Sequence, residues 1–314
     1  MKQNISFGWR VPDFPEYGAD NPTFRRHIFD YMDVLQAASW HSAWVGDHFF
    51  PFLAELDQSM DTIEAWTTLT YLMAKYTKMH FGTIVLSQSY RPPAILAKMA
   101  AVAQWLSEGR FILGIGAGWK EDEYRAYGYE FPRAKVRLDQ LEEAVQIILK
   151  MWHEDSPSFH GAYYHIENAA CSPKPEQPIP LLIGGTGPRR TLNIVAKYAD
   201  WCNLNNSTLI ESRQSLEVLQ KHCQRVGRDY QEIVKTYACD SLIVAARRDE
   251  VNRIRDSSYS AKFGLPIAGT PDEVSDQIKA YTDLGVTHFI LRFADFPRTD
   301  GVKLFIREVL PRFS

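Results

Sequence analysis

The chain has 314 residues, of which 45% are hydrophobic and 23% are charged, and its formal net charge is -3. This composition is typical of a globular protein with a large buried core, and the balanced charge argues against a nucleic-acid-binding surface. The sequence has no apolar run of about 18 residues, no secretory leader and no C-x-x-C cysteine pair, so we expect a cytoplasmic protein with reduced thiols and no membrane partner.

Short apolar segments alternate with longer segments of helical periodicity along most of the chain. Eight segments are predicted to be strands: residues 5–9, 42–46, 80–86, 111–115, 181–183, 200–204, 234–245 and 287–292. The predicted helices follow these strands in turn, at residues 24–40, 63–76, 95–106, 138–152, 191–198, 212–226, 270–284 and from about 301. In the third helix, one apolar stripe with a spacing of about 3.6 residues is formed by Ile95, Met99, Val102 and Leu106.

Two stretches interrupt this regular order. Residues 156–180 hold several prolines and the aromatic run 159–166, which predicts a β-hairpin excursion in the middle of the chain. Residues 247–268, after the seventh strand, are polar and predict a mobile insertion. The helix after this insertion has a clear start at Thr270-Pro-Asp-Glu273, with a threonine cap, a proline in the first turn and a glutamate three residues after the cap.

The order of elements predicts the fold class. Strands that are separated by helices run parallel, and eight such units close into a (β/α)8 barrel. We therefore predict an α/β fold of the TIM-barrel type, with residues 1–314 in a single domain. The alternative is an open doubly wound sheet. That fold places its phosphate-binding loop after the first strand, whereas the glycine clusters here follow the fourth and fifth strands.

The strand ends supply the candidate catalytic residues, because the active site of a barrel enzyme lies at the C-terminal ends of its strands. The second strand is followed by Asp47 and His48, and the third by Ser87. A histidine in this position can exchange a proton near neutral pH, and an adjacent carboxylate would raise its basicity. The alternative is a histidine that hydrogen-bonds the backbone and only fills space.

A glycine cluster ends the fourth strand, where residues 114–119 read Gly-Ile-Gly-Ala-Gly-Trp. Bare backbone at Gly116 and Gly118 can approach a flat or phosphorylated ligand closely, because no side chain is in the way. Trp119 occupies the position at which a dinucleotide-binding fingerprint requires glycine, and it predicts a wall beside a planar ring. The alternative is a tight strand-to-helix turn that simply packs well.

A second cluster follows the fifth strand, where Gly185, Thr186 and Gly187 lead into a helix. The free N–H groups at the start of that helix would bind a phosphate or another anion, although an ordinary strand-to-helix turn is the alternative. No H-E-x-x-H motif or other ligand set indicates a metal site. His160 and His165, on the predicted hairpin, are interpreted as surface residues.

Five segments, taken in order, make the chain similar to the luciferase-like monooxygenase superfamily, which contains bacterial luciferase, FMN-dependent monooxygenases and coenzyme F420-dependent oxidoreductases. The segments are Trp44-Val-Gly-Asp-His-Phe49, Phe81-Gly-Thr-Ile-Val-Leu86 with Arg91-Pro-Pro-Ala94, Gly114 to Trp119, Pro180 to Gly187, and Gly269-Thr-Pro-Asp-Glu273. The resemblance covers nearly the whole chain. It implies a (β/α)8 barrel with an extra middle segment, which binds a flavin or a deazaflavin at its open end.

Within that superfamily, the segment Gly46-Asp-His-Phe49 resembles the F420-dependent branch more than the FMN-dependent branch. The resemblance implies that Asp47 and His48 lie beside the cofactor ring and that His48 takes part in proton transfer. It also implies a non-prolyl cis peptide between Ile84 and Val85, at the back of the ring. Further cofactor contacts are expected at Ser87, Gly116, Gly118, Trp119, Gly185, Thr186 and Gly187.

The chain departs from one group of the superfamily. In the sugar-phosphate dehydrogenases, a glutamate directly follows the glycines of the fourth strand, and this chain has Trp119 there, which argues against oxidation of a sugar phosphate. Asp122 and Glu123 lie just beyond and are candidates for contact with substrate or cofactor, or for a solvated helix start. The aromatic residues expected to form an apolar chamber over the ring are Trp9, Phe49, Tyr90 and Trp119.

We therefore expect an F420-dependent oxidoreductase that transfers a hydride between the deazaflavin and a small organic substrate, with His48 as proton donor or acceptor. The alternative is an FMN-dependent monooxygenase that uses O2 and reduced flavin from a separate reductase. The third hypothesis is a barrel that binds flavin without catalysing a reaction. The family often dimerises through outer helices, so a homodimer through residues 63–76 is also expected; the alternative is that this helix only packs on the barrel.

Overall fold

The computed structural model describes residues 4–51, 59–262 and 267–313. Its central feature is a closed ring of parallel strands. Strand β1 (Ser6–Arg10) pairs with β2 (Ser42–Val45) on one side and with β12 (Val286–Phe293) on the other. The ring closes because β10 (Val234–Val244) pairs in parallel with both β12 and β9 (Trp201–Asn205). The predicted (β/α)8 barrel is therefore confirmed, and an open sheet is excluded.

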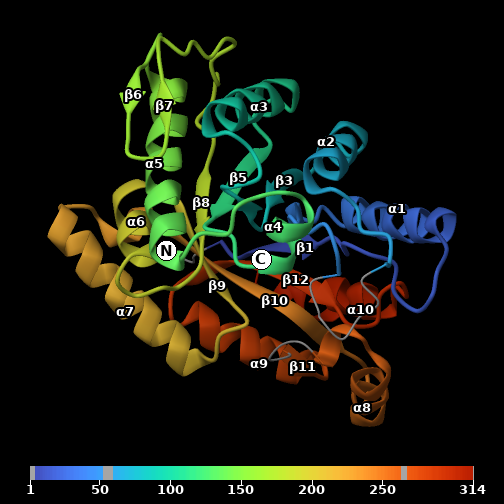
Figure 1. The fold of residues 1–314 in the computed structure, drawn as a ribbon. Helices are drawn as coiled ribbons and strands as arrows, with labels where there is room; N and C mark the ends of the chain where they lie inside the picture. Colours follow the sequence, from blue (N-terminus) through green and yellow to red (C-terminus); the bar gives the residue numbers. More distant parts are fainter. Residues whose placement is uncertain (1–3, 52–58, 263–266, 314) are drawn as a thin grey trace.

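The other three strands of the ring are β3 (His80–Thr83), β5 (Phe111–Gly116) and β8 (Leu181–Gly184). Helices surround the ring (Figure 1): α1 (Asn21–Ala37), α2 (Ala65–Lys75), α3 (Pro93–Leu106), α4 (Glu121–Ala126), α5 (Ala134–His153), α6 (Thr191–Tyr198), α7 (Leu209–Val226), α8 (Arg248–Ser257), α9 (Pro271–Thr282) and α10 (Asp300–Glu308). Short 3-10 helices lie at Tyr230–Glu232, Ser260–Lys262 and Leu310–Arg312. Among the described residues, no helix is both long and apolar enough to cross a lipid bilayer.

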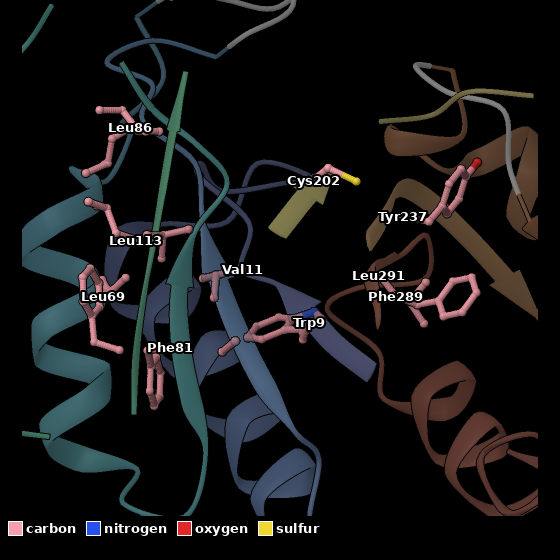
Figure 2. Packing of buried hydrophobic residues seen from close by; sticks show 14 of the residues in the cluster. Trp9, Val11, Leu69, Phe81, Leu86, Leu113, Cys202, Tyr237, Phe289 and Leu291 are labelled. Atoms are coloured by element: carbon pink, nitrogen blue, oxygen red, sulfur yellow. The ribbon is translucent and has the colours of Figure 1, made fainter. Parts of the chain in front are cut away.

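The barrel wall separates two apolar cores, because successive side chains of a strand point to opposite faces. The larger core lies between strands and helices, where Figure 2 shows Leu69 of α2, Phe81 of β3 and Leu113 of β5. Trp9 of β1 belongs to this outer core, since its ring stacks on Tyr31 of α1 at a centroid distance of 4.6 Å. The placement of Trp9 over a cofactor ring at the open end is therefore wrong.

The smaller core fills the inside of the barrel, and its largest member is Trp44, which is fully buried. Gly8 and Gly82 lie on the strands that flank it. A Cβ atom added to Gly8 would lie 2.4 Å from the indole of Trp44, and one added to Gly82 would lie 2.3 Å from it. Glycine at both positions therefore makes room for an indole in the centre of the ring.

The third predicted strand is broken into two pieces. β3 ends at Thr83, and β4 (Leu86–Ser87) resumes the pairing with β5 after the Ile84–Val85 peptide, which is cis as the family resemblance implies. The Thr83 hydroxyl donates to the Gly114 carbonyl at 2.7 Å and accepts from the Gly114 N–H at 2.8 Å, so a side chain joins the strands where the regular pairing stops.

The apolar stripe of the third helix does not face the barrel. The core face of α3 consists mainly of Leu96 and four alanines, while Ile95 and Leu106 are 55% and 67% exposed. Small alanine side chains let the helix pack closely, and this leaves the bulky residues on the outer side. There they border a groove of about 460 Å³ between α2 and α3, which also includes Trp66 and Met73.

The two irregular stretches have different outcomes. The hairpin is confirmed as an antiparallel pair, β6 (Phe159–His160) and β7 (His165–Ile166). The described part of the stretch 247–268 is more regular than a mobile insertion, because it contains α8, a 3-10 helix and part of β11 (Ile267–Gly269), which pairs with the C-terminal part of β10. Residues 263–266 of this predicted insertion lie outside the described residues. Ion pairs one turn apart, such as Arg253 with Asp249, support α8 despite its polar sequence.

Helix starts follow the sequence signals closely. α9 begins with the predicted capping box, in which the Thr270 N–H donates to Glu273 Oε2 at 2.9 Å. α7 begins with a second capping box at Thr208 and Glu211, which places its start three residues before the predicted one. In both helices, side chains satisfy backbone groups that the first turn leaves unpaired.

Candidate active site

A cavity of about 550 Å³ opens at the C-terminal ends of the strands. The residues that line it include Asp47 and His48 after β2, Gly116 at the end of β5 and Gly185 after β8. Among the described residues, the lining consists of Arg10, Asp47, His48, Ile84, Val85, Leu86, Ser87, Tyr90, Gly116, Ala117, Gly118, Trp119, Lys120, Glu123, Gly184, Gly185, Thr191, Asn203, Asn205, Asn206 and Asp240. The histidine and both glycine clusters therefore face one shared space.

Two predicted cofactor contacts, Thr186 and Gly187, are not among the residues that line this cavity. The chain leaves the wall at Gly185, whose φ of +102° turns the backbone towards α6. Thr191 at the start of α6 lines the cavity instead, and its Oγ1 would lie 2.7 Å from a Cβ added to Gly187. The turn into the helix thus replaces loop backbone with a helical side chain.

Asp47 is buried and fully engaged with groups other than His48. Its two oxygens accept hydrogen bonds from the Arg91 guanidinium at 3.0 and 3.1 Å, and Oδ2 also accepts from the Ser87 N–H at 2.9 Å. Burial raises the pKa of the Asp47 carboxyl, and Arg91 and Ser87 only partly offset this effect. Asp47 therefore ties the ends of β2 and β4 to the start of α3, and the expectation that it acts on His48 is wrong.

The carboxylate that does meet His48 belongs to Glu123 of α4. His48 Nδ1 lies 3.2 Å from Glu123 Oε1, and Oε1 also accepts from the N–H groups of Phe49 and Phe50 at 2.9 and 3.2 Å. The Tyr90 hydroxyl donates to Glu123 Oε2 at 3.3 Å. An imidazole that donates its Nδ1–H to a carboxylate keeps Nε2 as its proton-accepting atom.

Sequence reasoning named Glu123 only as one of two acidic candidates and did not assign it this role. The first turn of α4 holds three acidic residues in a row, Glu121, Asp122 and Glu123. Of the three, only Glu123 is buried, and with Tyr124 it makes up the buried part of this short helix. No local pattern separates the three, so the assignment required the tertiary structure.

Gly116 at the end of β5 and Gly118 just after it are needed for the packing of the cavity wall. A Cβ on Gly116 would lie 2.8 Å from the Val85 side chain, and a Cβ on Gly118 would lie 1.8 Å from the Tyr124 hydroxyl. That hydroxyl is 2.6 Å from Ser87 Oγ. The strand-to-helix packing that the sequence left as an alternative is therefore real, and the same backbone also lines the cavity.

Aromatic side chains form the outer part of the site. Trp119 is 62% exposed at the rim, and its ring meets His48 edge to face at 5.7 Å. Phe49 packs between Tyr90 at 4.6 Å and Tyr127 at 4.3 Å. Of the four aromatic residues predicted for this chamber, Tyr90 and Trp119 line the cavity and Phe49 supports Tyr90 from behind.

Asp240, which sequence reasoning did not single out, forms a polar cluster in the cavity lining with two strand-end residues, Arg10 and Asn206. Arg10 is ion-paired with Asp240, and Asp240 Oδ2 accepts from Asn206 Nδ2 at 2.6 Å. Burial opposes the charge of Arg10, but Asp240 and Asp13 outweigh it and raise the pKa of this guanidinium. Asp240 reaches the cavity where the register of β10 against β12 shifts, and such a bulge leaves no clear trace in an alternating sequence pattern.

The residues present suit a planar heterocyclic cofactor. Ile84 and Val85 offer an apolar surface, and Trp119 offers a flat aromatic one. Asn203 and Asn205 bring hydrogen-bonding groups to another side of the same cavity. An apolar pocket with a few convergent polar groups is the usual form of a cofactor site.

Comparison with known proteins agrees with this geometry. The family model described as luciferase-like monooxygenase matches residues 4–263. A curated F420-dependent glucose-6-phosphate dehydrogenase from Amycolatopsis mediterranei is 28% identical and covers 91% of this chain and 94% of its own. One from Kineococcus radiotolerans is 27% identical, covering 90% and 92%.

Solved structures show the same fold at low sequence identity. An F420-dependent secondary alcohol dehydrogenase in complex with an F420-acetone adduct aligns with a TM-score of 0.84 at 18% identity, covering 99% of both chains. A monooxygenase from Streptomyces bottropensis aligns with a TM-score of 0.82 at 16% identity, covering 99% of this chain and 100% of its own. Since the family model spans most of the barrel, the chain belongs to the luciferase-like monooxygenase family.

Proposed function

We propose that this protein is a coenzyme F420-dependent oxidoreductase, which transfers a hydride between the deazaflavin and a small organic substrate. The observation that carries the proposal is His48, held at Nδ1 by the buried Glu123 in the wall of the cavity that Val85 and both glycine clusters share. The names of the curated relatives support the choice of cofactor. A bound deazaflavin would supply the hydride chemistry, so the protein has to hold the ring and move a proton.

The proton step falls to His48. For the oxidation of an alcohol, a bound deazaflavin would accept the C–H hydrogen as a hydride, and His48 Nε2 would take the O–H proton, so that a carbonyl is formed. In the reverse direction, His48 returns the proton to the alkoxide oxygen. Glu123 accepts from Nδ1–H in both directions and so holds the imidazole in one orientation.

The proposed cofactor contacts divide between side chains and backbone. Ile84 and Val85 would support one face of the ring, and the main chain at Gly116, Gly118 and Gly185 would approach it closely. Ser87 and Trp119 would complete the contacts at the wall and rim, and Asp47 would act by positioning Ser87. Thr186 and Gly187 lie outside the cavity lining, so we propose them as contacts only for a phosphate that extends from the cavity towards the start of α6.

The charges of the cavity indicate an uncharged substrate rather than a sugar phosphate. Its lining cations, Arg10 and Lys120, are ion-paired with Asp240 and Asp122. Within the described lining, no lysine or arginine is therefore left without a carboxylate partner to bind a phosphate dianion, and burying an unpaired charge is costly. Trp119, where sugar-phosphate dehydrogenases have glutamate, agrees with this substrate class.

Equilibrium binding tests the proposal against an FMN-dependent monooxygenase. We expect the purified protein to quench or shift F420 fluorescence with a dissociation constant at least tenfold lower than that for FMN. FMN binding tighter than F420 by more than tenfold, or about 1.4 kcal/mol, would overturn the choice of cofactor. In that case a separate reductase and O2 become the co-reactants to assay.

We also propose that the chain forms a homodimer through α2 and α3. The groove between these helices is lined mostly by apolar side chains, and Ile95 and Leu106 at its border are more than half exposed. Contiguous exposed apolar surface on a globular protein usually marks an interaction site. A second copy of the same face would cover it and create a closed, symmetric contact.

A further inference from the structure

The hairpin of β6 and β7 has one polar face that carries two histidines and a glutamate. His160 and His165 are direct partners in the antiparallel register, so their side chains project to the same side of the hairpin. Glu167 follows the end of β7, and its carboxylate lies beside both imidazoles. Phe159 and Ile166 project to the other side and pack against the apolar core. The hairpin is thus fixed on one face and open on the other.

The potential ligand atoms of the polar face already lie close together. Glu167 Oε1 is 3.3 Å from His160 Nε2 and 3.5 Å from His165 Nε2, and one ligand atom from each residue falls within 4.8 Å of the others. Bonds of about 2.0–2.2 Å to a tetrahedral zinc ion place two ligand atoms about 3.4 Å apart. The two carboxylate–imidazole separations therefore already suit a bound zinc ion. The imidazoles are 3.0 Å apart at their Nδ1 atoms, and this hydrogen bond would be exchanged for bonds to the metal.

Neighbouring groups hold this arrangement in place. Ser158 Oγ donates to Glu167 Oε2 at 2.9 Å, which leaves Oε1 directed to the two imidazoles. The tip of the hairpin is fixed to α5, because the Glu143 carboxylate accepts from the N–H groups of residues 162–164 at 2.8–3.0 Å. Figure 1 shows the hairpin alongside α5. Partners of this kind orient metal ligands and increase affinity.

We propose that His160, His165 and Glu167 bind a single zinc ion, with water in the fourth position. Two imidazoles and one carboxylate suit zinc, whereas magnesium and calcium prefer oxygen ligands alone. The side chains are 60%, 60% and 56% exposed, so an ion can enter from solvent and exchange. This site is separate from the cavity and does not depend on the proposed oxidoreductase activity.

The bound ion would join two strands that are only two residues long each. Hairpins of this size have little stability of their own, so a cross-strand link would restrict their opening. The hairpin is also connected to the cavity wall. The Tyr164 hydroxyl donates to Gln88 Oε1 at 2.6 Å, and Gln88 follows Ser87, which lines the cavity. We therefore assign the ion a structural role, in which it holds the two strands of the hairpin together.

Titration calorimetry of the untagged, EDTA-treated full-length protein with zinc chloride tests the proposal. We expect one zinc ion per chain, a dissociation constant on the order of micromolar, and at least tenfold weaker binding of magnesium. His165→Gln should weaken zinc binding at least tenfold, and Ser158→Ala by a smaller factor. His153→Gln changes another exposed histidine, outside the cluster, and should leave zinc binding unchanged.

Zinc should also raise the melting temperature of the wild-type protein and of His153→Gln, but not that of His165→Gln. Circular dichroism checks that each variant is folded, and these side chains are too exposed for their loss to unfold the barrel. The proposal is overturned if zinc binds more weakly than about 100 μM, if His165→Gln binds it as tightly as the wild type, or if magnesium binds equally well. F420 affinity should be the same in all three variants, so this result is independent of the cofactor assignment.

Discussion

Glu123 meets His48 across 75 residues of sequence, with Oε1 of the carboxylate 3.2 Å from Nδ1 of the imidazole. The same carboxylate accepts from the N–H groups of Phe49 and Phe50, so it fixes both the ring and the loop that follows β2. This pairing gives the site an oriented base whose position depends on α4, the short helix that follows the glycine cluster at the end of β5.

Replacing His48 by alanine should reduce turnover with F420 and a small alcohol by roughly 10²- to 10⁴-fold, the usual contribution of a general acid–base group. The dissociation constant for F420 should stay within a few-fold, because most of the proposed ring contacts come from other residues. Steady-state rates and fluorescence titration measure the two effects. Unchanged turnover would remove the catalytic role of His48.

Glu123→Gln should lower kcat by roughly tenfold or more, since the amide can still accept the loop N–H groups but would hold the imidazole of His48 by a weaker, uncharged hydrogen bond. The affinity for F420 should change little. Glu121→Gln on the same helix is the matched control, because Glu121 is half exposed and is ion-paired with Arg125. Equal losses in both variants would mean that Glu123 has no special part in the reaction.

Acid should destabilise the protein through a histidine cluster at the base of the barrel. His41 stacks on His80 at 4.7 Å and meets His288 at 5.1 Å. Burial lowers the pKa of His41 to about 4 and that of His288 well below its usual range, and His80 shifts in the same direction.

The unfolded chain therefore binds more protons than the folded one between pH 6.5 and about 4, so stability falls as pH drops through this window. Between pH 7.5 and 5, the unfolding free energy of the wild type should fall by about 1–2 kcal/mol more than that of His41→Gln. Urea denaturation at the two pH values measures this. An equal loss in both proteins would exclude His41 as a source of the acid sensitivity.

Gly82→Ala should destabilise the barrel by about 1–3 kcal/mol, because its Cβ would lie 2.3 Å from the ring of Trp44. Adding Trp44→Phe should recover part of the loss, since the smaller ring leaves space for the methyl group. Urea denaturation of the two single variants and the double variant gives the coupling energy. Purely additive effects would show that the two sites do not compete for the same space.

Leu106→Glu should convert a dimer into a monomer if α2 and α3 form the interface. A buried charge without a partner strongly opposes association, and Leu106 is 67% exposed in the single chain. Light scattering coupled to size exclusion measures the mass, and Leu209→Glu, at an exposed site on α7, should leave it unchanged. A wild-type protein that is already monomeric at micromolar concentration would contradict the dimer.

Much of the fold was predictable because its signals are local. Strand and helix periods, the capping box at Thr270 and Glu273, and glycine at strand ends depend on residues a few positions apart. Eight strand–helix units in a row then leave few topologies besides the barrel, and this topology places His48 at the open end. The antiparallel hairpin at residues 159–166 followed from the same kind of local pattern.

The partners of the site residues were decided only by the tertiary structure. Asp47 and His48 are adjacent in sequence, yet they face different neighbours, Arg91 for the first and Glu123 for the second. Adjacent residues diverge because successive side chains of an extended chain point apart, while contacts across the barrel depend on how loops and helices pack. For the same reason, the sequence did not predict that a register shift in β10 places Asp240 in the cavity lining. It also did not predict that the alanines of α3 face the barrel while the bulky apolar residues of this helix face outward.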